Sequence, residues 1–157
     1  MRTIIHCASV EYRGSCFLLF GQSGAGKTTT ANSIVRTVGF ALIHDDIGCI
    51  DNIDGKPVFS SIQKPLSVYP IVAAFGVVKS NEVSVKELKP LEQRVFIIKS
   101  LYEGFGKTHW TRQKKVEIFR SSVCYSDLFP VYELHLPLGG VVITAIKGVI
   151  DPLIDRH

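Results

Sequence analysis

The strongest constraint on the fold of this chain is a glycine-rich segment, residues 21–28, which reads GQSGAGKT. It follows a short apolar run at residues 16–20 and leads into a segment with helical periodicity at residues 28–38. A strand, a tight glycine turn and then a helix form the context that a P-loop requires. Glycines let backbone N–H groups approach phosphate closely, and the start of the helix adds a partial positive charge. The pattern therefore predicts an α/β fold that binds a nucleotide with Mg²⁺.

Each residue type in this loop has an expected role. Lys27 can reach the β- and γ-phosphates as a point charge, and the Thr28 hydroxyl is placed to ligate Mg²⁺. A plain glycine turn with an exposed lysine is the alternative, and the flanking strand and helix favour the nucleotide site. The residues expected to contact the nucleotide are Gly21, Gln22, Ser23, Gly24, Ala25, Gly26, Lys27, Thr28 and Thr29.

Two adjacent aspartates, Asp45 and Asp46, follow the next apolar run at residues 40–44, which predicts a second buried strand. Ligands of α/β sheets bind at the carboxyl ends of strands, so both acids are expected beside the glycine-rich loop. One carboxylate can hold the metal, and the other can take a proton from an attacking hydroxyl. A turn cap is the alternative, because aspartate is common where strands end.

Alternating apolar residues and turn signals predict further strands of a mixed β-sheet. The Asp54-Gly55 pair predicts a hairpin between two extended segments. The polar segment 61–69 is expected to be a loop that, with residues 104–111, shapes an acceptor pocket. The strands are expected at residues 3–10, 16–20, 40–44, 47–50, 57–60, 71–79 and 131–136.

Helices are predicted on both sides of this sheet. Pro90 and Thr111 are well placed to begin two of them, after the helix at residues 28–38. Residues 141–150 fit a strand or a helix, and a helix is favoured because it would close the domain. The side chains expected to face the core are Ala31, Ile34, Val35, Val38, Leu91, Val95, Ile98, Leu101, Tyr102, Val116, Phe119 and Val123.

The 157 residues are predicted to form one domain, 1–157, and the net charge of +4 comes from scattered basic residues. No nucleic-acid partner is therefore expected.

The spacing of the cysteines does not suit zinc, which indicates buried thiols in a reducing compartment. No apolar run approaches the ~20 residues of a membrane span. A cytoplasmic protein without a membrane partner follows. The cysteines are Cys7, Cys16, Cys49 and Cys124.

Three segments together resemble the catalytic domain of HPr kinase/phosphorylase and its serine-kinase relatives. His6 lies upstream of the loop where that family has a histidine, and residues 21–28 have the form of the family's loop. Residues 40–46 resemble its apolar strand ending in an aspartate pair. The resemblance covers roughly residues 3–60. It implies an α/β P-loop fold, similar also to ATP-dependent phosphoenolpyruvate carboxykinase, and a homo-oligomer.

The resemblance also implies roles for single residues. Lys27 and the loop amides would bind phosphate, and Thr28 with Asp46 would hold Mg²⁺. Asp45 would be the base, with His6 beside it as a group that tunes or assists it. The division between the two aspartates could also be the reverse. The glutamate–arginine–glycine signature of true HPr kinase/phosphorylases is absent from the sequence, which argues against a dephosphorylating activity.

The leading hypothesis is an enzyme that moves the γ-phosphoryl group of ATP, with Mg²⁺, to a serine or threonine hydroxyl of a protein or peptide. A small-molecule kinase is the second hypothesis. A non-catalytic module that binds ATP and regulates another protein is the third. A GTPase switch is disfavoured because the sequence lacks the Asn-Lys-x-Asp motif that reads guanine.

Overall fold

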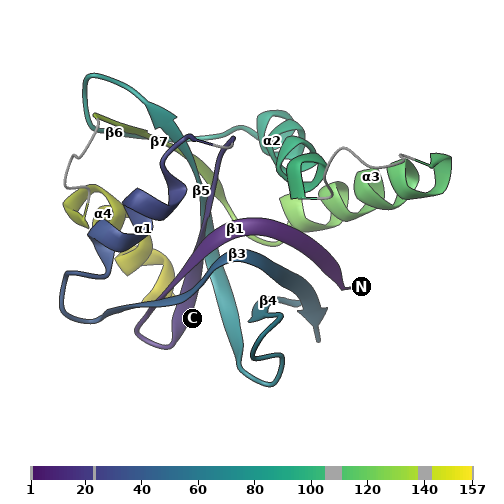
Figure 1. Cartoon of the computed structure of the whole chain (residues 1–157), viewed down its shortest axis with the longest axis horizontal. Helices are drawn as coiled ribbons and strands as arrows, with labels where there is room; N and C mark the ends of the chain where they lie inside the picture. Colours follow the sequence, from purple (N-terminus) through teal and green to yellow (C-terminus); the bar gives the residue numbers. More distant parts are fainter. Residues whose placement is uncertain (1, 23, 105–110, 138–142, 157) are drawn as a thin grey trace.

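The computed structural model describes residues 2–22, 24–104, 111–137 and 143–156 (Figure 1). Single helices or a helix pair separate runs of strands along this length. The elements in chain order are β1 (Thr3–Tyr12), β2 (Ser15–Phe20), α1 (Lys27–Ile34), β3 (Phe40–Ile53), β4 (Lys56–Ser61), β5 (Val68–Lys79), β6 (Ser84–Glu87), α2 (Pro90–Gly104), α3 (Arg112–Ser126), β7 (Val131–Leu136) and α4 (Ile143–Ile154).

The described strands form one seven-stranded mixed sheet in the order β2-β1-β3-β4-β5-β7-β6, with a further parallel pairing of β2 and β5. Strand β5 changes partner along its length. It pairs with β4 at its start, with β2 from Ile71 to Gly76, and with β7 from Ala74 to Lys79. Since β2, β5 and β7 are parallel, their carboxyl ends lie at one edge of the sheet, where ligands of α/β sheets bind. The predicted mixed α/β fold is confirmed.

Two apolar clusters lie on opposite faces of this sheet. Helices α1 and α4 cover one face, and α2 and α3 cover the other (Figure 1). Strand β2 contributes to both clusters, because successive side chains of a strand point to opposite faces. Phe17 lies in the first cluster and Phe20 in the second. A strand buried on both faces reads as a continuous apolar run, which explains the run at residues 16–20.

Local signals predicted the turns and helix starts correctly. Asp54 and Gly55 have φ angles of 51° and 80°, as the hairpin between β3 and β4 requires. Helix α2 begins at Pro90, and the Thr111 side chain caps α3 by accepting a hydrogen bond from Lys114 N at 3.3 Å. The last described segment, α4, is a helix.

None of the helices in the described residues has the length and apolar character of a membrane span.

The strand that carries the two aspartates differs from its prediction. Residues 40–44 are not a separate buried strand but the first part of the long strand β3. Asp45 and Asp46 therefore lie in the middle of a strand, not at its carboxyl end. Strand β4 pairs with β3 only from Gly48 onward. The segment with the aspartates therefore pairs with β1 alone, and most of its side chains are partly or fully exposed.

The faces that two helices turn inward also differ from the prediction. In α2, Leu91 and Val95 are exposed, and the buried side chains include Ile97 and Leu101. In α1, the helix ends at Ile34, so Val38 lies beyond it and is 98% exposed. Some of the side chains expected in the core are buried, namely Ala31, Ile34 and Leu101. Two more are partly buried and pack against the clusters, namely Val35 and Tyr102.

Helix α3 buries a face rich in serine instead of its apolar stripe. Val116 and Phe119 are exposed, whereas Ile118, Ser122 and Tyr125 are buried. The Tyr125 hydroxyl donates to Thr3 Oγ1 at 3.0 Å and lies 3.1 Å from Ile50 O. These buried hydrogen bonds fix the rotation of α3 against β1 and β3, because a buried hydroxyl without a partner would be costly.

Gly48 gives a direct test of how tightly β3 and β4 pack. A Cβ atom at this position would overlap the ring of Phe59, which is fully buried and cannot move aside. We expect Gly48→Ala to lower the free energy of unfolding by about 1–3 kcal/mol, the cost of overpacking a core. Gly148→Ala is the matched control. Gly148 lies in α4 with open space around its Cβ position, so alanine should stabilise by about 0.5–1 kcal/mol. Urea denaturation of both variants measures the difference, and equal stabilities would contradict it.

Candidate functional site

The glycine-rich loop joins the end of β2 to the start of α1. Gly24 and Gly26 have φ angles of 81° and 97°, a region that other residues rarely adopt. At Gly21, where φ is 153°, a Cβ atom would lie 2.9 Å from Ala25 Cβ. The loop is closed by a hydrogen bond from Ala25 N to Gln22 O at 2.9 Å. The glycines are therefore required by the backbone itself. Ser23, a predicted contact, lies outside the described residues.

Lys27 is the first residue of α1, and it is 7% exposed. Its ammonium group folds back over the loop and donates to Gly21 O at 2.6 Å and to Gln22 O at 3.3 Å. A positive charge is thus held against the loop, at the helix end that carries partial positive charge. An anion placed here would meet both.

Two side-chain pairs lie next to this lysine. Thr28 Oγ1 donates to Asp45 Oδ1 at 3.1 Å, and His6 Nε2 lies 3.0 Å from Asp46 Oδ1. The pairing is the reverse of the expected one, in which Asp45 would face His6 and Asp46 would join Thr28. Asp46 has 63% of its side chain exposed, whereas His6 has 35%. The carboxylate of the second pair is therefore open to solvent on one side.

A β-bulge interrupts β3 just before the two aspartates. In the pairing of β1 with β3, Ser9 lies opposite His44 but Val10 lies opposite Leu42, so Ile43 is an extra residue. A bulge bends its strand and changes the aim of the side chains beside it. Asp45 follows two residues later, and both carboxylates border the same hollow although neighbouring strand residues ordinarily point to opposite faces.

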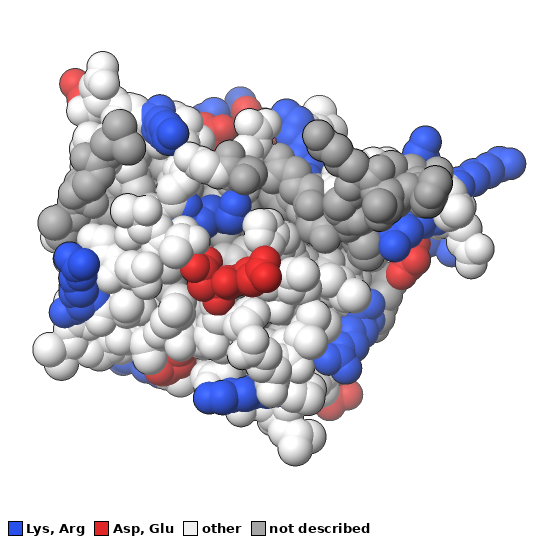
Figure 2. All heavy atoms as spheres, in the orientation of Figure 1, with Lys and Arg blue, Asp and Glu red and all other residues white. Residues whose placement is uncertain are grey.

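This acidic hollow has a volume of about 380 Å³. Figure 2 shows acidic side chains gathered over β1 and β3, directly beside a basic side chain. The residues that line it come from β1, the glycine-rich loop, α1 and β3. They are His6, Gly24, Gly26, Lys27, Thr28, Thr29, Asp45 and Asp46. Gly21, Gln22 and Ala25 shape the loop without lining the hollow. The structure thus brings together residues that are far apart in the sequence.

The thiol beneath the hollow is inert. Cys7 lies on β1 opposite Asp46, and it is 1% exposed. Burial raises its pKa well above the usual value, and the nearby Asp45 adds to this effect, whereas Lys27 opposes it. The thiol therefore stays protonated at neutral pH and is not a nucleophile. Cys16 and Cys49 are also buried and Cys124 is partly so, as free thiols.

Oxygen atoms are the groups that could bind a metal in this hollow. The described residues contain no group of three or more histidine, cysteine, aspartate or glutamate side chains that could hold a metal. The Thr28 hydroxyl and the Asp45 carboxylate do lie together. Mg²⁺ prefers oxygen ligands and usually takes only one or two carboxylates, with phosphate and water completing its shell. The donor set fits Mg²⁺ on this chemistry.

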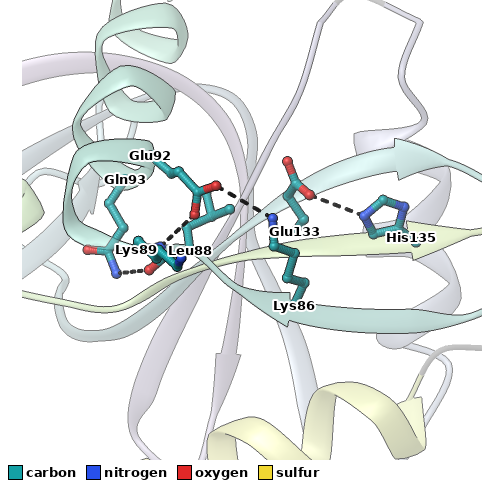
Figure 3. Close-up of polar contacts among 7 residues, drawn as sticks. All are labelled: Lys86, Leu88, Lys89, Glu92, Gln93, Glu133 and His135. Carbon is teal, nitrogen blue, oxygen red and sulfur yellow. Dashed lines mark hydrogen bonds and ion pairs between the residues drawn. The ribbon is translucent and has the colours of Figure 1, made fainter.

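A second polar cluster, which the sequence reasoning did not predict, joins β6, β7 and α2 (Figure 3). Lys86 Nζ lies 3.6 Å from Glu92 Oε1, and the Glu92 carboxylate accepts a hydrogen bond from Lys89 N at 2.8 Å. His135 Nε2 lies 3.2 Å from Glu133 Oε2 on β7. The Lys89 hydrogen bond lowers the pKa of Glu92, so this carboxylate stays charged at the start of α2. The Glu92 contacts cap a helix and tie it to the sheet edge.

The fold is a mixed α/β sheet with helices on both faces and a glycine-rich loop at the carboxyl edge. Among solved structures, the HPr(Ser) kinase/phosphatase from Coxiella burnetii is similar, with a TM-score of 0.51 over 99% of this chain and 99% of that chain. The two sequences are 11% identical, so the similarity is one of fold. No family model and no curated protein matches the sequence. The resemblance is therefore confirmed for the fold, and membership of that family stays a prediction.

Proposed function

We propose that this protein transfers the γ-phosphoryl group of ATP to a hydroxyl group, the serine or threonine of a protein or peptide. One observation carries the proposal. The acidic hollow combines a lysine held over a glycine-rich loop, a hydroxyl–carboxylate pair and a histidine–carboxylate pair. Phosphoryl transfer needs these three functions, which are phosphate binding, metal binding and activation of the acceptor. The similarity in fold to a kinase/phosphatase agrees with this reaction class.

Lys27 and the loop amides bind the phosphates in this proposal. The Lys27 ammonium already lies at the loop, so little reorganisation is needed when the loop carbonyls are exchanged for phosphate oxygens. Thr28 and Asp45 hold Mg²⁺, which would neutralise charge on the phosphates during transfer. This reverses one part of the earlier expectation, because Asp45, not Asp46, is the carboxylate beside Thr28.

Asp46 is the base in this proposal, and His6 positions it. The exposed side of the Asp46 carboxylate leaves room for an acceptor hydroxyl, while His6 holds the other side. The hydroxyl proton passes to Asp46 as the acceptor oxygen bonds to the γ-phosphorus. The bond from that phosphorus to the bridging oxygen breaks, and ADP leaves with the electron pair. A positioned base of this kind typically contributes about 10²–10⁴-fold to the rate.

The direct test is transfer from γ-labelled ATP in the presence of Mg²⁺, with libraries of serine and threonine peptides, proteins and hydroxyl metabolites offered separately. Label on a peptide or protein is the expected result. Label only on a metabolite would identify a small-molecule kinase instead. Tight ATP binding with no transfer to any acceptor or to water would contradict catalysis and leave a nucleotide-binding regulatory module.

A further inference from the structure

A second cavity, of about 170 Å³, lies beside the glycine-rich loop. One wall is formed by loop residues 24–26 and by side chains of α1, among them Thr30 and Ser33. The other wall is formed by the ends of β5 and β7, including Val77, Leu136 and Pro137. None of the acidic residues of the hollow belongs to this lining.

The sheet topology explains why the cavity is there. Strand β2 ends at Phe20, which pairs with Gly76, and the chain then turns away into the glycine-rich loop. Strand β5 continues to Lys79, and β7 runs beside it to Leu136. The ends of β5 and β7 thus extend past the end of β2, and the cavity forms between them and the first turns of α1. It lies at the carboxyl ends of parallel strands, the usual ligand position in such sheets.

The two chambers are adjacent and differ in chemistry. Gly24, Gly26 and Thr29 line both the acidic hollow and the second cavity, so a ligand that lies along these residues would contact both. The hollow is charged, with Lys27 and two carboxylates. The second cavity combines apolar side chains with the small polar residues Thr29, Thr30 and Ser33, and its described lining includes one charged residue, Lys79. A nucleoside triphosphate has the matching two ends, an anionic triphosphate and a flat, largely apolar base.

We propose that the second cavity binds the nucleobase of the phosphoryl donor. The proposal rests on the proposed function and adds an orientation to it. The γ-phosphate points toward Asp46, and the chain of phosphates follows the loop so that the base lies between Ser33 and Pro137. The volume supports a base and not a whole nucleotide, because pockets that enclose drug-sized ligands measure about 300–1,000 Å³.

Filling the cavity should separate base binding from phosphate binding. Ser33 is partly exposed on α1, so Ser33→Trp can place an indole in the cavity without entering the core. We expect its affinity for Mg·ATP to fall about tenfold or more, while affinity for inorganic tripolyphosphate stays within about twofold. Asn32→Trp is the matched control, because Asn32 is exposed on the same helix and does not line the cavity. Calorimetry with both ligands, and a melting curve for each variant, give the measurements.

Pro137→Trp narrows the cavity from the opposite wall without altering the loop or α1. This variant should also lose affinity for Mg·ATP and keep its affinity for tripolyphosphate. It is the decisive variant if Ser33→Trp lowers the affinity for both ligands by distorting α1. Unchanged ATP affinity in Pro137→Trp, or equal loss of both ligands there, would overturn the assignment of the cavity. The proposed function would survive that outcome if tripolyphosphate still binds in a manner that depends on Lys27. If the unaltered protein binds neither ATP nor tripolyphosphate, the proposed function itself fails.

Discussion

Replacing Asp46 with asparagine is expected to lower the rate of phosphoryl transfer by about 10²–10⁴-fold and to leave ATP affinity unchanged. The amide keeps the shape of the side chain and can still contact His6, but it cannot accept the hydroxyl proton. Asp46 lies outside the glycine-rich loop that we propose binds phosphate, and its partner is His6 at 3.0 Å, so ATP binding should not depend on it. Single-turnover transfer and ATP titration, run on the same preparation, measure the two quantities.

Asp45→Asn is the informative comparison, because Asp45 is paired with Thr28 and not with His6. Loss of this carboxylate should raise the Mg²⁺ concentration needed for half-maximal transfer, and saturating Mg²⁺ should restore much of the rate. Identical behaviour of the two variants at every Mg²⁺ concentration would refute the division of roles. Full activity in both would refute the kinase mechanism.

Lys27→Ala is expected to weaken Mg·ATP binding by about 10–150-fold, since hydrogen bonds to charged groups contribute roughly 1.5–3 kcal/mol. Among the described residues, Lys27 donates to carbonyl groups of the loop alone, so its removal takes away the cation that we propose contacts the phosphates and spares the apolar clusters. Tripolyphosphate should lose affinity in parallel with ATP.

Lys56→Ala is the control for this variant, because Lys56 is an exposed lysine at the β3–β4 hairpin, away from the loop. It removes the same charge from the molecule and should leave ATP affinity unchanged. Calorimetry together with melting curves provides the measurement. Unchanged affinity of Lys27→Ala with a normal melting curve would exclude the glycine-rich loop as the nucleotide site.

The parts of the site that were predictable from sequence depend on local backbone chemistry. Glycines at residues 24 and 26 adopt positive φ angles, and Asp54-Gly55 forms the expected hairpin, because these conformations are decided within a few residues. The pairing of the two aspartates was not predictable. It depends on how β3 lies against β1 and α1, because His6 comes from β1 and Thr28 from α1. Contacts between segments that are distant in the sequence leave no local signal at the aspartates themselves.

The prediction of which helix faces are buried was wrong for a related reason. Periodicity correctly placed α2 and α3, but it assumed that the most apolar stripe is buried. In α3, the hydrogen bonds of Tyr125 with Thr3 and Ile50 turn a serine-rich face inward and leave Phe119 60% exposed. A buried polar network is costly to leave unsatisfied, so it outweighs the gain from burying one more aromatic ring. Nothing in the sequence of α3 alone identifies its partners on β1 and β3.

The position of β2 has a consequence for the order in which the protein folds. One edge of β2 pairs with β1, its neighbour in the hairpin. The other edge stays unpaired until β5 is made, and β5 follows β3 and β4 in the chain. Contacts between distant segments form late, because closing a long loop costs entropy before the contact is gained. During synthesis the glycine-rich loop therefore follows a strand, β2, that has one unpaired edge. Such an edge is a template for pairing with other chains. A nucleotide that binds at the loop, as we propose, would stabilise the completed sheet. Adding nucleotide is therefore expected to act on the last step of folding and not on the first.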